Sequence, residues 1–215
     1  MDAVIFDMDG VLLDTESVCL ECWKIAGDEF KINDAKILFD LCIGQNLNDT
    51  LSLLANRLGG TDAANAFYSR TGELFREIEQ TRGLSLMNGA EECLTSLKKI
   101  GIRLALASST RREAVERQLK AAKIFDFFES VTTGDEVLHS KPAPDIYLRS
   151  LSTLNLTSEK CIAVEDSPNG VRSATSAGLR CVMIPDQIQP NEEIKSKAWK
   201  ILPSLKSFAE IVSTF

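Results

Sequence analysis

Two aspartates that follow a short apolar run are the residues with the clearest chemical potential in this 215-residue chain. Residues 3–6 are Ala-Val-Ile-Phe, and Asp7, Asp9 and Gly10 come next. The apolar run predicts a buried parallel strand, and Gly10 allows a sharp turn after it. Side chains two positions apart on an extended backbone point to the same side, and two close carboxylates repel unless a cation or a shared proton separates them. The pair therefore predicts a site for a hard cation such as Mg²⁺, which bridges to phosphate, although an acidic turn is the alternative interpretation.

Polar groups also follow later strands. Ser108 comes after an apolar run, Lys141 lies in a proline-containing turn, and Glu165 and Asp166 follow another apolar run. A serine hydroxyl with neighbouring backbone N–H groups suits phosphate oxygens, and a fixed lysine suits a phosphoryl group. Because ligands bind at the carboxyl ends of strands in open α/β sheets, we expect these side chains to meet the N-terminal aspartates at one edge of one sheet.

The elements that must position these groups fall into two patterns. From about residue 83 onward, strand-like and helix-like segments alternate, which predicts a parallel sheet with right-handed crossovers and helices on both faces. Residues 15–82 show helical periodicity with almost no strand signal. We therefore expect an α/β fold, with a Rossmann-like core domain formed by residues 1–14 plus 83–215 and an inserted all-helical cap domain at 15–82, over the strand ends.

Two helix starts are expected within this pattern. Thr61-Asp62 is typical of a helix cap, and we expect it to begin the last helix of the cap domain. In the core, we expect a helix from Gly170 to Ala177, ended by Gly178.

Composition limits the classes of partner. The chain is 44% hydrophobic and 26% charged, with a net charge of -7, which argues against nucleic acid or an anionic membrane as a partner. A small anionic substrate remains compatible, since a bound cation can invert the local field. The N-terminus lacks the positive region of a signal peptide, and no run approaches the roughly 20 apolar residues of a membrane span. Six scattered cysteines favour free thiols, so we expect a cytoplasmic protein.

In their order, these motifs resemble the haloacid dehalogenase-like hydrolase superfamily, in the helical-cap subgroup that contains β-phosphoglucomutase and small sugar-phosphate phosphatases. The resemblance covers nearly the whole chain. It rests on residues 7–11, on Ser108 after its strand, on residues 140–145 around Lys141, and on residues 164–167.

The resemblance implies a role for each matching residue. Asp7 is the nucleophile that forms an aspartyl-phosphate, and Asp9 is the general acid and base. Ser108, with its neighbour Ser109, and Lys141 hold the phosphate.

The same resemblance implies a bound Mg²⁺. Its ligands are Asp7, the backbone carbonyl of Asp9, and Asp166, with Glu165 as a ligand or as a neighbour that supports one. The expected partner is a small phosphorylated metabolite.

Function within this family has three candidates. The expected one is a Mg²⁺-dependent phosphatase acting on a small phosphomonoester, most simply a sugar phosphate. The mutase branch carries a histidine ten residues after the second aspartate and an arginine in the following cap loop, where this chain has Cys19 and Leu47. Both departures favour hydrolysis over a phosphomutase. An idle phosphate-binding regulatory protein is the remote alternative, because every catalytic position holds the expected residue type.

Several other residues are open to two interpretations. The cap residues Glu16, Gln45 and Asn46 are the candidates for choosing the substrate. Cys19 and Cys22 form a C-x-x-C pair, but a closed zinc site needs about four ligands, so we favour packing in the helical core.

Three basic side chains near the motifs are also open to two interpretations. His139, the single histidine, is favoured as a surface or supporting residue rather than as a member of a Ser-His-Asp triad. Arg111 and Arg112 either reach the substrate or are simply exposed.

Overall fold

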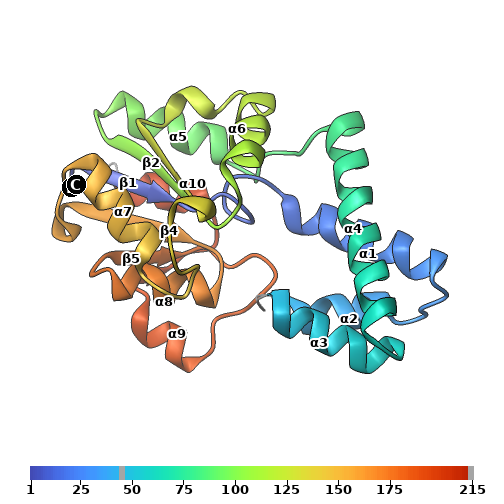
Figure 1. The fold of residues 1–215 in the computed structure, drawn as a ribbon. Helices are drawn as coiled ribbons and strands as arrows, with labels where there is room; N and C mark the ends of the chain where they lie inside the picture. The colour runs from blue at the N-terminus through green and yellow to red at the C-terminus, as the bar shows by residue number, and fades with distance from the viewer. Residues whose placement is uncertain (44–46, 213–215) are drawn as a thin grey trace. The chain divides into compact units, whose positions relative to one another are not determined.

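The computed structural model describes residues 1–43 and 47–212. The chain forms two compact units, Met1–Asp14 with Ser85–Phe215, and Thr15–Leu84. The first unit is an α/β sheet structure and the second is helical (Figure 1). The strands are β1 (Ala3–Phe6), β2 (Arg103–Ser108), β3 (Ser130–Thr133), β4 (Cys161–Glu165), β5 (Arg180–Met183) and β6 (Lys200–Ile201). The helices of the α/β unit are α5 (Ala90–Lys99), α6 (Arg112–Ala121), α7 (Asp145–Leu154), α8 (Pro168–Ser176), α9 (Glu192–Lys197) and α10 (Leu205–Val212), with short 3-10 turns η1 (Phe125–Phe127), η2 (Gly134–Glu136) and η3 (Ser158–Lys160).

The six strands form one parallel sheet in the order β3-β2-β1-β4-β5-β6. Strand β1 lies in the middle, and Ile5 is in register with Ala105 of β2 and with Ala163 of β4. The chain adds β2 and β3 on one side of β1 and then returns to add β4 on the other. This reversal of strand order is the place where open α/β sheets bind ligands. The structure thus confirms the predicted α/β fold.

Helices cover both faces of the sheet. On one face Ala3 and Ile5 of β1 belong to a buried cluster with residues of α7, α8 and α9, including Tyr147. On the other face Phe6 meets Phe208 of α10, with their ring centroids 6.1 Å apart and nearly perpendicular, and α10 packs on α5. Because successive side chains of a strand point to opposite faces, a short apolar strand supplies both cores.

In its described residues, 15–43 and 47–84, the helical unit has four helices around an aromatic core. These are α1 (Thr15–Glu29), α2 (Ala35–Cys42), α3 (Leu47–Leu58) and α4 (Thr61–Arg82). The Trp23 ring lies 5.5 Å from that of Phe39 and 5.3 Å from that of Phe67, in edge-to-face geometry. Such pairs add stability beyond the area they bury, so Trp23 anchors this unit. Cys22 is buried in the same cluster, and Leu84 packs against it.

One of the two expected helix starts was right in position, and the other was wrong. Helix α4 begins at Thr61 as expected, although the residue at its N-cap position is Gly60, with φ at 144°. Helix α8 begins at Pro168, two residues before the expected start, because the Ser167 side chain accepts a hydrogen bond from the Gly170 N–H and caps the helix. Proline suits the first helical position, since its missing N–H has no partner there anyway.

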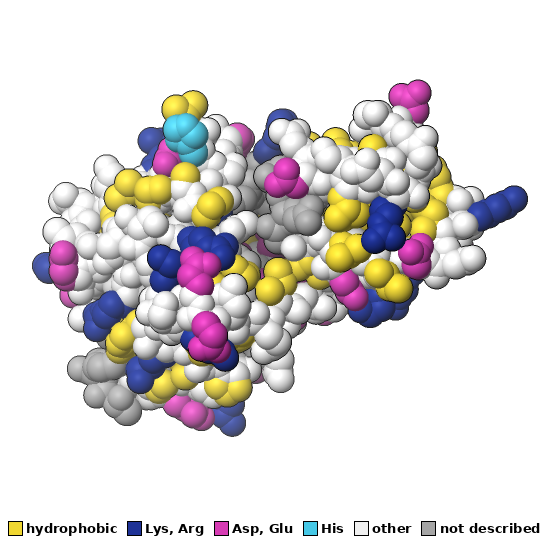
Figure 2. All heavy atoms as spheres, turned by 90° about the horizontal axis from the view of Figure 1, so that it is seen from below, with side chains coloured by type: hydrophobic (Ala, Val, Ile, Leu, Met, Phe, Trp, Pro, Cys, Tyr) yellow, Lys and Arg dark blue, Asp and Glu magenta, His cyan; other side chains and the backbone are white. Residues whose placement is uncertain are grey.

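The surface carries both signs of charge. On the face drawn in Figure 2, acidic and basic side chains are interspersed among hydrophobic and uncharged atoms. None of the helices in the described part of the chain combines the length and the apolar character needed to cross a membrane.

Candidate active site

Asp7 lies directly after the central strand β1, at the carboxyl edge of the sheet. Its backbone N–H still donates to Val164 of β4, at 2.9 Å, so the sheet fixes its main chain. The chain then turns tightly, because the N–H groups of Leu12 and Leu13 both donate to the carbonyl of Met8. Gly10 adopts φ of +72° within this turn, a conformation that disfavours other residues. Backbone hydrogen bonds therefore hold the main chain at Asp7 and at Met8, the residue between the two aspartates.

Lys141 connects three parts of the sheet edge. Its Nζ donates to Asp7 Oδ1 at 2.6 Å, to Glu165 Oε1 at 2.7 Å and to the carbonyl of Ala107 at 3.0 Å. An ammonium group has three protons to donate, so these acceptors fix its position. The Lys141 side chain is only 8% exposed. Burial alone would lower the pKa of Lys141, but the charges of Asp7 and Glu165 outweigh it and hold the pKa above its ordinary value.

Glu165, the last residue of β4, has no exposed surface, and neighbouring elements surround its carboxylate. Besides Lys141, the buried hydroxyl of Tyr147 on α7 donates to Oε1 at 2.6 Å. Burial and the charge of Glu165 raise the pKa of Tyr147, which keeps the phenol protonated and able to donate. Gly170 of α8 lies against the same carboxyl group, and a Cβ atom at this position would overlap it.

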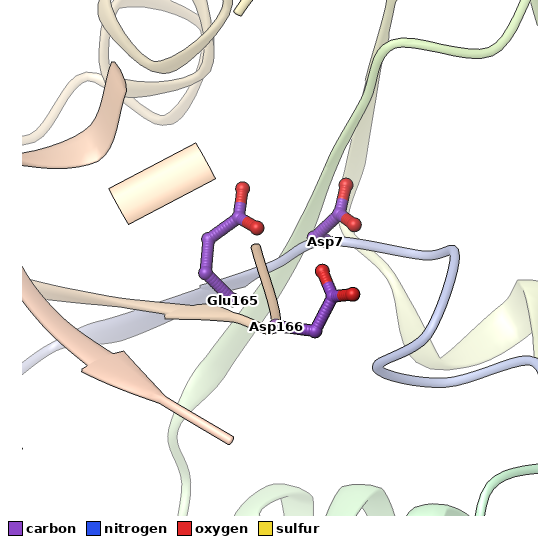
Figure 3. A group of neighbouring side chains, drawn as sticks. All are labelled: Asp7, Glu165 and Asp166. Carbon is purple, nitrogen blue, oxygen red and sulfur yellow. The ribbon is translucent and has the colours of Figure 1, made fainter. Parts of the chain in front are cut away.

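The carboxyl groups of Asp7, Glu165 and Asp166 gather at the ends of β1 and β4 (Figure 3). One oxygen from each lies within 4.8 Å of the others. Asp166 also fits closely, since a Cβ at Gly10 would stand 2.5 Å from its Oδ2. Oxygen ligands of this kind, converging on one point, are what a hard divalent cation requires. The residues present therefore fit a magnesium ion.

The electrostatics of the cluster point the same way. Burial raises the pKa of the Asp7 carboxyl to about 8, Lys141 opposes the rise, and the charges of Glu165 and Asp9 add to it. Several carboxyl groups thus compete for the ammonium group of Lys141. A cation bound beside Asp7 would stabilise its ionised form.

A third set of groups comes from the end of β2. Ser108 is fully buried, and its Oγ lies 3.4 Å from Asp9 Oδ2. The Thr110 hydroxyl donates to the same oxygen at 3.0 Å, and the Thr110 N–H donates to Ser108 Oγ at 3.1 Å. Ser109, the other expected phosphate-binding residue, is exposed between them. The structure thus brings Asp9 to the end of β2, the strand whose Ala107 carbonyl also accepts from Lys141.

Three supporting residues of the site were not expected from the sequence: Tyr147, Gly170 and Thr110. Tyr147 is one tyrosine in an apolar helix, a pattern as typical of a core as of a site. A signal existed for Thr110, which follows Ser108 by two residues in a polar segment at a strand end. Gly170 falls at the expected helix start, where a glycine is common even when no neighbouring side chain requires it.

Other residues singled out in the sequence lie elsewhere. His139 is exposed, and its Nδ1 lies 3.0 Å from Asp145 Oδ2. Arg112 is engaged locally, since its Nη2 donates to Glu136 Oε2 and to the carbonyl of Val131, both at 2.7 Å.

The remaining candidate residues belong to the helical unit. Cys19 and Cys22 are free cysteines of its core, and burial raises the pKa of Cys22 to about 11. Glu16 lies in the first turn of α1 and is half-buried. Gln45 and Asn46 lie outside the described residues.

Comparison with known proteins places this geometry in a family. Residues 4–184 match the model of the haloacid dehalogenase-like hydrolases. The phosphorylated carbohydrates phosphatase of Thermotoga maritima is 37% identical over 184 residues, covering 83% of this chain and 82% of that protein.

Two solved structures are similar over almost their full length. One, from Thermotoga maritima, carries the name of a β-phosphoglucomutase and has a TM-score of 0.82 at 31% identity, covering 100% of this chain and 99% of the other. The other is CbbY from Rhodobacter sphaeroides in complex with phosphate, with a TM-score of 0.76 at 26% identity and 95% of both chains covered. The chain therefore belongs to the haloacid dehalogenase-like hydrolase family.

Proposed function

We propose that this hydrolase cleaves a small phosphomonoester, in the class of sugar phosphates, through an aspartyl-phosphate on Asp7 with Mg²⁺ bound. The observation that carries the proposal is the buried Lys141 ammonium, bonded to Asp7 and Glu165 beside Asp166. A fixed positive charge next to a carboxylate is what nucleophilic transfer of an anionic phosphoryl group requires. The similarity to a phosphatase of phosphorylated carbohydrates supports the substrate class.

The first step forms the covalent intermediate. Ser108 donates a hydrogen bond to a phosphate oxygen, the positive charge of Lys141 attracts the phosphate, and an Asp7 carboxylate oxygen attacks the phosphorus. The bond from phosphorus to the ester oxygen breaks, and Asp9 gives its proton to the departing alkoxide. Asp7, the backbone carbonyl of Asp9 and Asp166, with Glu165 as a ligand or as a supporting neighbour, would hold a magnesium ion. Its positive charge would offset the repulsion between the two anions.

The second step releases phosphate. Asp9, now ionised, takes a proton from water, and the water oxygen attacks the phosphorus of the aspartyl-phosphate. The bond from phosphorus to Asp7 breaks and frees inorganic phosphate, so the sum of the two steps is ester plus water giving alcohol plus phosphate.

A phosphomutase is the second candidate, because one similar structure carries that name. A mutase must keep water from the intermediate and grip a second phosphate. At the two aligned cap positions this chain has Cys19, a half-buried thiol, and Leu47, whose apolar side chain is 52% exposed. A thiol with an ordinary pKa near 8.5 is a poor base at pH 7, and leucine offers a phosphate no hydrogen bond. These positions favour hydrolysis.

The deciding experiment measures two products from each sugar monophosphate in the presence of Mg²⁺. Free phosphate is followed directly, and isomerisation of β-glucose 1-phosphate is followed by a coupled glucose 6-phosphate assay with a bisphosphate activator present. We expect phosphate release with little isomerisation, and no activity from Asp7→Asn. Faster isomerisation than phosphate release would establish the mutase, and no turnover of sugar or aryl phosphates would establish an idle phosphate-binding protein.

The helical unit is proposed to select the substrate. Glu16, Gln45 and Asn46 remain the candidate selecting residues, and substitution of each should alter the relative kcat/KM among sugar phosphates more than that for an aryl phosphate.

A further inference from the structure

We infer that Thr110 is a positioning residue that holds the Asp9 carboxylate in place while water attacks the phospho-enzyme. The inference deepens the proposed function and rests on it. At the end of β2, two hydroxyl groups approach one oxygen of Asp9. Thr110 Oγ1 lies 3.0 Å from Asp9 Oδ2, whereas Ser108 Oγ lies 3.4 Å from it. Hydrogen bonds between hydroxyl and oxygen groups cluster near 2.7–2.8 Å and weaken with distance, so Thr110 makes the stronger contact.

The two hydroxyl groups are not equivalent once phosphate is bound. A serine hydroxyl has a single proton to donate. In the proposed reaction Ser108 donates that proton to a phosphate oxygen, so it releases Asp9 Oδ2. Thr110 has no such second task, and its bond to Asp9 persists through both steps.

The backbone of Thr110 is suited to this task because it is held on both sides. Its N–H donates to Ser108 Oγ at 3.1 Å, and its carbonyl accepts from the Gly134 N–H at 3.1 Å. Gly134 begins η2, where Thr133 and Glu136 form a capping box. The Arg112 N–H in turn donates to Asp135 Oδ1 of that turn, at 3.0 Å. Thr110 thus presents its hydroxyl from a segment that two neighbouring elements fix.

A carboxylate held by a hydroxyl donor matters most in the second step. There Asp9 must accept a proton from a water molecule aligned with phosphorus, and misplaced general bases lose much of their effect. In the first step an activated leaving group such as nitrophenolate departs without a proton. Loss of the Thr110 hydroxyl should therefore slow hydrolysis of the intermediate and spare its formation from an aryl phosphate.

The test compares Thr110→Val, which keeps the branched shape, with Thr110→Ser, which keeps the hydroxyl. With p-nitrophenyl phosphate, we expect Thr110→Val to lower kcat about tenfold or more, the scale of a hydrogen bond to a charged group. KM should fall in parallel, so that kcat/KM changes less than about twofold, and a burst of nitrophenol should precede the steady state. Thr110→Ser should restore kcat to within about threefold of wild type.

Two controls separate positioning from folding. Thr175→Val removes a half-buried hydroxyl that donates to the carbonyls of Val171 and Arg172 in its own helix α8, and its kcat should match wild type. Thr110→Ala provides a second variant without the hydroxyl and should reproduce the burst seen with Thr110→Val.

A double-mutant cycle tests whether Thr110 acts through Asp9. In an Asp9→Asn background, Thr110→Val should cost less than about twofold further, because the group it positions no longer serves as a base. Wild-type kinetics in Thr110→Val, equal losses in Thr110→Val and Thr110→Ser, or a full additional loss in the Asp9→Asn background would each overturn the inference. Failure of the proposed function has a different signature, because the wild-type protein itself would then release no phosphate.

Discussion

Gly170→Ala is expected to destabilise the protein, although alanine is preferred to glycine inside a helix by about 1 kcal/mol. Gly170 lies in α8, and a Cβ there would overlap the carboxyl group of Glu165. That carboxyl group cannot move freely, since its Oε1 accepts from Lys141 at 2.7 Å and from Tyr147 at 2.6 Å in a position without exposure to solvent. Space for the new methyl group can come only from displacing α8 or these hydrogen bonds.

The expected magnitude follows from the bonds at risk. Hydrogen bonds to a charged group contribute about 1.5–3 kcal/mol each, and a buried carboxylate left without its donors costs at least as much. Losing two such bonds and gaining the helix preference of alanine gives a net destabilisation of about 2–5 kcal/mol. The same displacement disturbs Lys141, so phosphatase activity should fall as well.

Gly72→Ala in α4 is the matched control. Gly72 is also inside a helix, but the atom nearest to the position of the added methyl group, Arg76 Nη1, is 3.7 Å away, an ordinary contact. This variant should gain about 0.5–1 kcal/mol. The free energy of unfolding measured in urea should therefore be lower than wild type for Gly170→Ala and higher than wild type for Gly72→Ala. A Gly170→Ala protein with unchanged or greater stability and full activity would refute the confinement of Glu165, whereas failure to fold would agree with it, since helix preference alone predicts the reverse.

Two further predictions concern the same cluster. Tyr147→Phe removes only the hydroxyl that donates to Glu165 and should destabilise the protein by about 1.5–3 kcal/mol in thermal or urea unfolding. The control Tyr68→Phe, at a tyrosine that is 38% exposed, should change stability by less than about 0.5 kcal/mol. Equal effects of the two substitutions would contradict the hydrogen bond from Tyr147 to Glu165. Excess chelator should abolish phosphate release and added Mg²⁺ should restore it, with Ca²⁺ a poor substitute because of its looser coordination geometry, and full activity in chelator would contradict the proposed cofactor.

The residues that meet at the sheet edge could be predicted because each is adjacent to a strand end. Asp7 follows β1, Ser108 ends β2, and Glu165 ends β4. In a parallel sheet this adjacency alone determines the edge on which a side chain lies, whatever the helices do.

The position of Lys141 could not be predicted from adjacency to a strand end alone. It lies in the turn between η2 and α7, far from any strand end in sequence, and its place was inferred from the rigid proline turn together with the family resemblance. The structure shows Lys141 bonded to both Asp7 and Glu165. Buried charges pair with opposite charges, but the sequence alone does not indicate which carboxylates lie within hydrogen-bonding distance of Lys141.

Tyr147 and Gly170 could not be predicted as supporting residues because their contacts depend on packing between distant elements. Tyr147 reaches Glu165 from a position 18 residues earlier in the chain. The close contact of Gly170 with Glu165 could not be foreseen from the expected helix, which was to start at this residue. The Ser167 cap and Pro168 start the helix two residues earlier, and Gly170 lies buried inside it.

Two of the supporting residues of the site come from one face of the sheet, and this has consequences for the whole α/β unit. Tyr147 belongs to α7 and Gly170 to α8, and both belong to or border the buried cluster that covers Ile5. On the opposite face, Phe208 of α10 packs against the apolar ring of Phe6. Since packed interiors transmit displacement, a volume change on the α7–α8 face shifts the carboxylate that holds Lys141. A change of the same size beside Phe208 acts first on stability, so the two cores of one short strand carry different constraints.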